Sequence, residues 1–441
     1  MTDLIVTNAR LIDADRDEPG GLRVANGRIA ELLPADLSSD DLGALACRHD
    51  AEVVDAEGLW LIPGGVDPHV HFALPVAGTV TVDDFASGSR AALAGGTTSF
   101  IDFITPAPGS SLIAATEARL AEAATSVCDH SFHLTVTSWG SGTAAEMRRC
   151  RDEFGLSSVK LYLAYLESIG LEDDDLFRAM RTAADLGLTV LLHCEDGHRV
   201  SARQKELLAA GRRGPDAHPD SRPAEFEVAS VLHALELAAR AGCLVYVVHA
   251  STAGAVEAVA RARDSGQSAL VETCPQYLLL DDSRYRGDPI DAAACVMSPP
   301  LRPVEHGAAL RRAVLTGMID TVGTDHCSFT IAQKTAAENF TRIPGGAAGV
   351  QHRLGLLRTA VPELTPRAWV KLISAEPARL FGFEGRKGCL KPGADADIVL
   401  WDPEAASILD GAADAHRCDH GIYDGIASLG RPRRVWQRRI V

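Results

Sequence analysis

Residues 63 to 384 repeat one pattern, in which a short apolar run is followed by a longer stretch with helical periodicity. This alternation predicts parallel strands joined by crossover helices. Eight such runs occur, and a chain of 441 residues can bury a large core. Eight parallel strands that close on themselves form a (β/α)8 TIM barrel, so we predict an α/β fold of this kind. The candidate strands are residues 66–71, 97–103, 131–137, 157–163, 188–193, 244–249, 268–273 and 319–324. The candidate helices are residues 83–94, 112–124, 144–154, 172–186, 223–241, 253–265 and 304–316.

Both ends of the chain have a different pattern, in which short apolar runs alternate with turn residues. Residues 4–33 predict small antiparallel strands, and the polar stretch 34–50 predicts a loop. Strand-forming residues return near 396–401 and 434–436, so the two ends are expected to join. The predicted domains are residues 1–62 with 385–441, a small β-sandwich, and residues 63–384, the barrel.

Composition narrows the possible classes of function. The formal net charge is −16, so we expect no extended surface for the phosphates of a nucleic acid. No apolar run has the length that a bilayer-spanning helix needs, and we expect no membrane partner. The ten cysteines form no CxxC pair, and the amino terminus has no secretory pattern. We therefore expect reduced thiols and a cytoplasmic location.

Two histidines, His69 and His71, follow the first apolar run and are separated by one residue. On an extended strand, residues i and i+2 point to the same face, so both imidazoles would reach one point. Imidazole nitrogens bind zinc and its neighbours among the transition metals. Such a pair also occurs as ordinary surface or core histidines, so its interpretation depends on further ligands elsewhere in the chain.

Four more polar residues occupy later strands of the predicted barrel. Lys160 lies in the fourth strand, His193 ends the fifth, His249 the sixth and Asp325 the eighth. The carboxyl ends of barrel strands meet at one face, where barrel active sites are built. We therefore expect these side chains to converge with the two histidines. Four histidines, an aspartate and a lysine at one face predict a metal centre.

Lys160 requires its own explanation, because a free ammonium group is not a metal ligand. A charged lysine in an apolar strand beside cations would be costly. One interpretation is a neutral amine that adds carbon dioxide and becomes a carbamate, whose two oxygens could bridge two metal ions. The other is an ordinary lysine, which either extends its charged end to solvent or pairs with a carboxylate.

Several motifs jointly resemble those of the amidohydrolase superfamily, and specifically its dihydropyrimidinase (hydantoinase) group of cyclic amidases. The similarity covers nearly the whole chain. The motifs that carry it are Pro63-Gly64-Gly65-Val66-Asp67-Pro68-His69-Val70-His71, Val159-Lys160-Leu161-Tyr162-Leu163-Ala164-Tyr165, His193-Cys194-Glu195-Asp196-Gly197, Glu272-Thr273-Cys274-Pro275-Gln276-Tyr277, Gly323-Thr324-Asp325-His326-Cys327, and residues 78–85, 95–98, 298–302 and 391–397.

The resemblance implies a binuclear metal centre. Its cofactors would be two divalent ions, with zinc the first choice from the ligand types and manganese or cobalt as alternatives. A carboxyl group derived from carbon dioxide would sit on Lys160 and bridge the two ions. The implied ligands are His69, His71 and Asp325 for one ion, His193 and His249 for the other, and Lys160 for both.

The same resemblance implies roles in catalysis and in substrate binding. Asp325 would accept the proton of the attacking water and pass it to the leaving nitrogen. Tyr165 would donate a hydrogen bond to the developing oxyanion. The backbone of Ser298 would contact the imide of the substrate. Gly345 stands where relatives often carry an asparagine, so any contact there would come from its backbone.

The implied reaction opens a cyclic ureide, either a hydantoin or a dihydropyrimidine, to an N-carbamoyl amino acid. Dihydroorotases usually have an arginine two residues after the second histidine, where this chain has Ala73. Allantoinase remains the alternative enzyme, and a non-catalytic scaffold with lost ligands is the alternative class. The sequence leaves open which ring is the physiological substrate and which of its stereoisomers is hydrolysed. The apolar loop residues expected to select the ring substituent are Val76, Tyr162 and Ile169.

The resemblance also implies assembly into a homodimer or a homotetramer. Many relatives carry a carboxyl-terminal tail that helps to assemble oligomers, and this sequence stops at Val441. A dimer is therefore expected more firmly than a tetramer.

Overall fold

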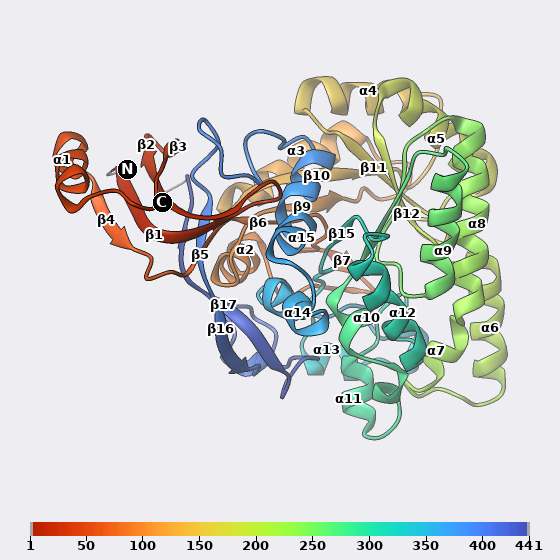
Figure 1. Cartoon of the computed structure of the whole chain (residues 1–441). Coiled ribbons are helices and arrows are strands. Elements are labelled where there is room, and N and C mark those ends of the chain that lie inside the picture. The colour runs from red at the N-terminus through yellow and green to blue at the C-terminus, as the bar shows by residue number, and fades with distance from the viewer. Residues whose placement is uncertain (1–2, 439–441) are drawn as a thin grey trace.

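The computed structural model describes residues 3–438 and has an eight-stranded parallel sheet at its centre (Figure 1). The hydrogen-bonded order is β15-β14-β13-β12-β11-β10-β9-β6, in which each strand pairs with its neighbour along the chain. This order confirms the predicted TIM barrel. Most residues of these strands are buried, because helices cover the outside of the sheet. Their bounds are β6 (Gly65–Asp67), β9 (Thr97–Ile104), β10 (Asp129–Thr135), β11 (Ser158–Tyr162), β12 (Thr189–His193), β13 (Val245–Val247), β14 (Ala269–Thr273) and β15 (Thr321–Val322).

Side-chain hydrogen bonds close the barrel between its first and last strands. The buried Asp67 carboxylate accepts hydrogen bonds from the backbone nitrogen of Thr324 at 3.2 Å and from its hydroxyl at 2.7 Å. The same carboxylate accepts a 3.1 Å bond from the backbone nitrogen of His69. Since Asp325 directly follows Thr324, these bonds bring Asp325 next to His69.

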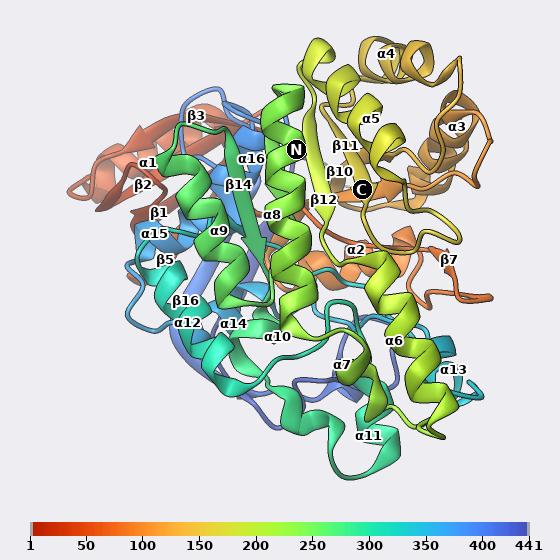
Figure 2. The same ribbon diagram turned by 90° about the vertical axis from the view of Figure 1, so that its right-hand side faces the viewer.

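Helices surround the barrel, as Figure 2 shows from the side of α8 and α9. Within residues 3–438, no helix combines the length and the hydropathy that crossing a membrane requires. The first four are α2 (Phe85–Ala94), α3 (Leu112–Glu122), α4 (Thr143–Phe154) and α5 (Asp173–Leu186). After β12 come α6 (Gly197–Ala209), α7 (Ala217–Ser221) and α8 (Ala224–Ala241), and after β13 comes α9 (Ala253–Asp264). The remainder are α10 (Pro275–Leu279), α11 (Pro289–Ala294), α12 (Val304–Leu315), α13 (Ile331–Thr335), α14 (Arg353–Ala360), α15 (Pro366–Val370) and α16 (Glu376–Leu380).

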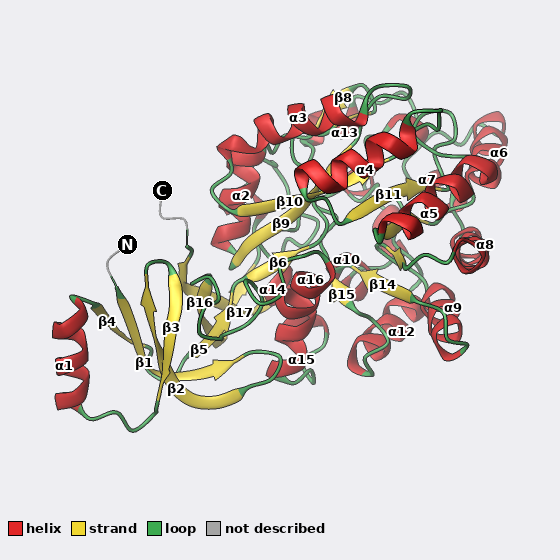
Figure 3. Cartoon of the chain, turned by 90° about the horizontal axis from the view of Figure 1, so that it is seen from above, coloured by secondary structure: helices red, strands yellow, loops and turns green. Residues whose placement is uncertain are grey.

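The strands of the two chain ends lie beside the barrel (Figures 1 and 3). They form one seven-stranded mixed sheet in the order β17-β16-β5-β1-β2-β3, with β4 paired to β1. Pairing of β16 with β5 therefore joins the end of the chain to its beginning. The strands predicted as a small β-sandwich belong to this single hydrogen-bonded sheet. Their bounds are β1 (Leu4–Ile12), β2 (Asp17–Ala25), β3 (Arg28–Leu33), β4 (Glu52–Asp55), β5 (Trp60–Pro63), β16 (Ile398–Ile408) and β17 (Ala427–Trp436).

The stretch 34–50 contains α1 (Ser39–His49), so the prediction of a loop there was wrong. The Ser38 side chain accepts a hydrogen bond from the backbone nitrogen of Asp41, which caps the first turn. Basic Arg48 lies in the last turn, where it complements the helix dipole. None of the helix residues is buried, and Figure 3 shows α1 at the outer end of the sheet. The apolar stripe of this helix is short and only half-buried, consisting of Leu42, Leu45 and Ala46, and it lies within a polar stretch of sequence.

A separate apolar cluster fixes the interior of the barrel. It joins Phe103 of β9, Leu191 of β12, Tyr246 of β13 and Phe381. Because β9 and β12 are not neighbours in the sheet, side chains that connect them lie inside the barrel. Leu191 and His193 are two residues apart on one strand and share a face. The His193 imidazole is therefore directed to the barrel interior.

Candidate metal centre

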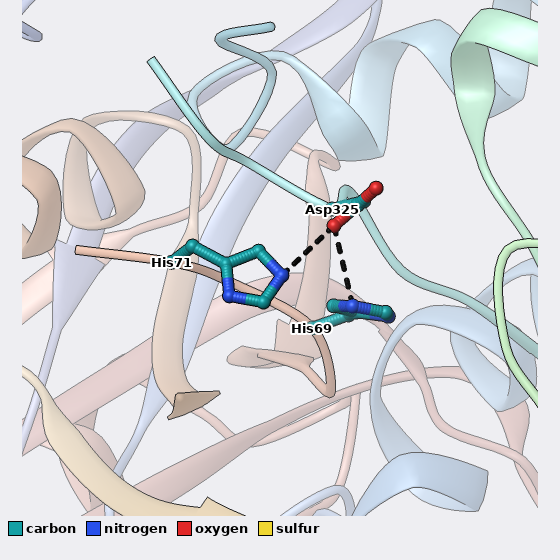
Figure 4. A group of neighbouring side chains, drawn as sticks. All are labelled: His69, His71 and Asp325. Carbon is teal, nitrogen blue, oxygen red and sulfur yellow. Dashed lines mark ion pairs between the residues drawn. The ribbon is translucent and has the colours of Figure 1, made fainter. Parts of the chain in front are cut away.

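His69, His71 and Asp325 converge at the seam of the barrel (Figure 4). One oxygen of Asp325, Oδ1, lies 3.2 Å from Nε2 of His69 and 3.0 Å from Nε2 of His71. The predicted strand 66–71 ends earlier, at Asp67, but both imidazoles still reach one point. Burial alone would raise the pKa of Asp325, but the two histidines and Lys160 hold it below its usual range. The carboxylate therefore stays ionised as a ligand should.

His193 and His249 form a second group of nitrogen donors. Nδ1 of His193 lies 3.0 Å from Nε2 of His249. The ring of His249 is also 5.4 Å from the ring of His69, so the two groups are neighbours. Burial lowers the pKa of His193 and that of His249, which favours neutral imidazoles with a free lone pair. Neutral imidazole is the form that binds a metal ion.

Two buried carboxylates orient these imidazoles. Oε1 of Glu272 lies 2.8 Å from Nδ1 of His69, and Oε2 of Glu195 lies 2.8 Å from Nε2 of His193. Each carboxylate accepts a hydrogen bond from the N–H of its histidine. The opposite ring nitrogen is then unprotonated, and its lone pair points to the centre of the site. Carboxylates of this kind accompany most metal-binding histidines and raise their basicity. Arg222 compensates the charge of Glu195 through a short ion pair.

Lys160 lies on β11 and is almost completely buried. Its Nζ is 4.9 Å from the ring centroid of Tyr162 and 5.5 Å from that of Phe103. Burial lowers the pKa of Lys160 to about 8, although Asp325 and Glu272 act in the opposite direction. An amine with this pKa is partly neutral near physiological pH, so it can act as a nucleophile.

One cavity of about 550 Å³ contains every predicted site residue in its lining. The hairpin of β7 (Pro75–Val76) and β8 (Thr79–Val80) contributes to its wall. The nine residues predicted as ligands, catalytic groups or substrate contacts are His69, His71, Lys160, Tyr165, His193, His249, Ser298, Asp325 and Gly345. The three residues predicted to select the ring substituent, Val76, Tyr162 and Ile169, line the same cavity.

Three of these residues have left-handed backbone conformations. The φ angles are 58° at Tyr165, 40° at His249 and 52° at Asp325. Non-glycine residues adopt this conformation at a cost of order 1–3 kcal/mol, and such residues cluster at functional sites. The strained backbone at these three positions is consistent with side chains that must point in a particular direction into the site.

Gly345 occupies the place where relatives often have an asparagine. A Cβ atom at this position would lie 3.8 Å from Cα of Met297, which is an ordinary contact distance. The structure therefore has room for a side chain here. Its absence widens the cavity and leaves the backbone of Gly345 as the group that can contact a ligand.

Several residues of the site were not singled out in the sequence. Glu195 and Glu272 lie within the motifs quoted above, but a carboxylate that orients a histidine has no spacing signal of its own. Arg222 and His218 also line the cavity, and Lys334 lies behind it. Only their burial in the fold separates these polar residues from the many on the surface.

The donor set fits divalent metal ions. Four histidine nitrogens and an aspartate oxygen are directed to one region, and buried carboxylates set two of the imidazoles in the tautomer that binds metal. Such a mixture of imidazole and carboxylate suits zinc, manganese and cobalt.

Comparison with known proteins gives one family and a consistent set of relatives. The description "Amidohydrolase family" matches residues 60–427. A dihydropyrimidinase of Arabidopsis thaliana is 36% identical over 436 residues, which are 98% of this chain and 80% of that protein. A D-hydantoinase of Streptomyces coelicolor is 36% identical over 440 residues, which are 99% of this chain and 92% of that protein. The crystal structure of dihydropyrimidinase from Brevibacillus agri NCHU1002 has a TM-score of 0.94 at 32% identity, covering 99% of this chain and 94% of that one.

Proposed function

The chain belongs to the amidohydrolase family, and from this premise we propose that it is a cyclic amidase. The proposed reaction hydrolyses one ring amide of a hydantoin or dihydropyrimidine and gives an N-carbamoyl amino acid. The observation that carries the proposal is the single cavity lined by all nine expected residues. Relatives named dihydropyrimidinase and D-hydantoinase, each 36% identical over nearly the whole chain, support the substrate class.

The proposed cofactors are two divalent ions, with zinc as the first choice and manganese or cobalt as alternatives. When bound, such ions supply Lewis acidity, which polarises a carbonyl and lowers the pKa of water. We propose His69, His71 and Asp325 as ligands of one ion, His193 and His249 as ligands of the other, and a carboxylated Lys160 as the bridge. The amine of Lys160 would add to carbon dioxide, form one N–C bond and release one proton.

Protein side chains would then handle the protons of the reaction. Asp325 would accept a proton from the attacking water and deliver it to the ring nitrogen as the C–N bond breaks. Its ionised state in the cluster with His69 and His71 suits the first of these steps. Tyr165, on the cavity wall, would donate its phenolic hydrogen to the oxygen that gains charge when water adds to the carbonyl. Backbone groups of Ser298 and Gly345 would hold the imide.

A substrate panel tests the reaction class. The metal-loaded protein is incubated with dihydrouracil, 5-substituted hydantoins of both hands, allantoin and dihydroorotate, and N-carbamoyl products are measured by chromatography. We expect turnover of dihydrouracil or hydantoins, including those with bulky substituents, because Val76 and Ile169 present aliphatic walls. Turnover of allantoin alone would assign the alternative, allantoinase. If no member of the panel is hydrolysed, the assignment to cyclic amidases is wrong.

Assembly of the metal centre should depend on pH through Lys160. Carbon dioxide adds only to the neutral amine, and burial lowers the pKa of this amine to about 8. The neutral fraction rises roughly tenfold per pH unit below that value and levels off above it. Metal-free protein, given zinc at a fixed concentration of dissolved carbon dioxide, should therefore regain activity much faster from pH 6 to pH 8 and gain at most about twofold more at pH 9. A rate that keeps rising toward pH 10 would indicate an ordinary lysine.

We also propose the remaining organisation of the protein. Residues 1–62 with 385–441 would form one domain and residues 63–384 the other, and the protein would be a cytoplasmic homodimer or homotetramer. The sheet that joins β16 to β5 supports the domain division. All ten cysteines are free, as expected in a reducing compartment.

A further inference from the structure

Lys334 is a buried cation behind the cavity. It lies on α13 and has an exposed fraction of 1%. Among the described residues, no carboxylate forms an ion pair with it. Instead, its Nζ donates to the carbonyl oxygens of Val296 at 2.8 Å, Pro344 at 3.1 Å and Gly346 at 2.6 Å. An ammonium group has three hydrogens, so all of its donors are used.

These three bonds connect two separate backbone segments. Val296 precedes Ser298 by two residues, and Pro344 and Gly346 flank Gly345 on either side. The backbone nitrogen of Gly346 also donates to the Val296 carbonyl at 3.0 Å. One side chain therefore holds together the two segments that carry the proposed imide contacts.

Other side chains form hydrogen bonds with three further carbonyls on either side of Ser298. The Tyr285 hydroxyl donates to the Cys295 carbonyl at 3.0 Å, and Nε2 of His218 lies 2.7 Å from the Met297 carbonyl. The Tyr277 hydroxyl donates to the Pro299 carbonyl at 2.7 Å.

Ser298 and Gly345 differ from these neighbours in the hydrogen bonding of their carbonyl groups. No residue within 3–438 donates a hydrogen bond to the carbonyl of either one. Both residues line the cavity. The flanking carbonyls are thus fixed from behind, and the backbone groups of these two residues remain available to a ligand.

We propose that Lys334 is a positioning residue, which sets the spacing of the Ser298 and Gly345 backbones and thereby the affinity for the substrate imide. This proposal rests on the cyclic amidase function. Loss of the ammonium group leaves the carbonyls of Pro344 and Gly346 without a donor, and the Val296 carbonyl keeps only the bond from Gly346. The segments therefore separate and substrate binding weakens. Lys334 does not touch the ligand cluster, so bond breaking itself is affected little.

Lys334→Met tests the proposal, because methionine keeps a similar length and volume without the charge. We expect KM to rise roughly 10- to 100-fold for every ring in the panel, with kcat changed by no more than about threefold and metal content unchanged. The ratio between substrates with different 5-substituents should stay the same, since all share the imide. Lys371→Met, which removes an exposed lysine, is the matched control and should leave KM unchanged.

Hydrogen–deuterium exchange gives a second measurement that needs no turnover. Lys334→Met should exchange faster than the wild type over residues 295–299 and 343–347, whereas Lys371→Met should not. Faster exchange with an unchanged KM would reduce Lys334 to a purely structural role and overturn the proposal. Unchanged exchange would overturn it as well. If the wild type hydrolyses none of the panel, the proposed function fails, and exchange still decides whether Lys334 fixes these segments.

The wild-type pH profile provides a test should Lys334→Met fail to fold. Burial lowers the pKa of Lys334 to about 8, so above this pH the neutral amine has two donors for three carbonyls. KM should therefore rise above about pH 8, whereas in Lys334→Arg, whose charge persists, KM should stay level over the same range. Equal profiles in both proteins would contradict the proposal. The other titratable groups near Lys334 are the thiols of Cys295, Cys327 and Cys418 and the imidazoles of His218 and His420. Burial raises the pKa of these thiols and lowers the pKa of these imidazoles, so all five groups stay neutral near pH 8.

Discussion

Lys160→Ala is expected to lose both the activity and the metal ions. The electrostatic reason is that two divalent ions bring four positive charges, against which Asp325 supplies one negative charge. A carbamate on Lys160 adds a second anion between them, and alanine removes it. We expect a fall in kcat/KM of at least about a thousandfold, since the loss of a single transition-state donor already costs about 10²–10³. Elemental analysis should show less than the full metal content at equal protein concentration.

Two further experiments separate a carbamate from an ordinary lysine. Lys160→Arg should be as inactive as the alanine variant, because a guanidinium stays cationic and cannot form a carbamate. Acetate or propionate should restore part of the activity of Lys160→Ala by placing a carboxylate in the space that the side chain leaves. Electron density for an unmodified ammonium group in a metal-loaded, active crystal would refute the bridging role.

The barrel could be predicted from the sequence because the pattern of one strand followed by one helix is repeated along the chain. Each strand is a short apolar run, and a boundary error of two residues leaves the order of strands unchanged. The convergence of His193, His249 and Asp325 follows from the same order, since each residue lies at or just beyond the carboxyl end of a barrel strand. The pattern of the barrel therefore predicted which residues meet without any knowledge of distances.

Other features depend on contacts between distant parts of the chain and have no local signal. Glu272 orients His69 across 203 residues, and Lys334 binds carbonyls on two loops. A buried carboxylate or lysine looks in the sequence like one on the surface, because its burial arises only when the barrel closes. The exposed helix α1 differs, since both its capping residue Ser38 and a short apolar stripe are local, but the polar residues around them made the stretch resemble a loop.

Tyr165→Phe is expected to slow the chemical step while the metal centre stays intact. Tyr165 lines the cavity, and its ring centroid is 5.3 Å from that of His193, so the phenol lies beside the proposed metal ligands. Burial raises the pKa of Tyr165 above its usual range, so the phenol keeps its proton at neutral pH and can donate it in a hydrogen bond. Phenylalanine preserves the ring and removes only this donor.

Since the oxyanion exists only in the transition state, the lost bond should lower kcat by about 10²–10³ and leave KM nearly unchanged. This signature differs from that of the other two variants, because Lys160→Ala should lose metal and Lys334→Met should raise KM at nearly constant kcat. Metal content at the wild-type level is therefore the control that makes the kinetic result interpretable. A wild-type kcat in Tyr165→Phe would contradict this role for Tyr165. The metal ions alone would then stabilise the oxyanion, and Tyr165 would serve only as a wall residue that contacts the ring substituent. A variant that binds substrate and product more weakly to the same extent would instead show that Tyr165 contributes uniform binding. Loss of uniform binding raises KM and leaves the bond-breaking step unchanged.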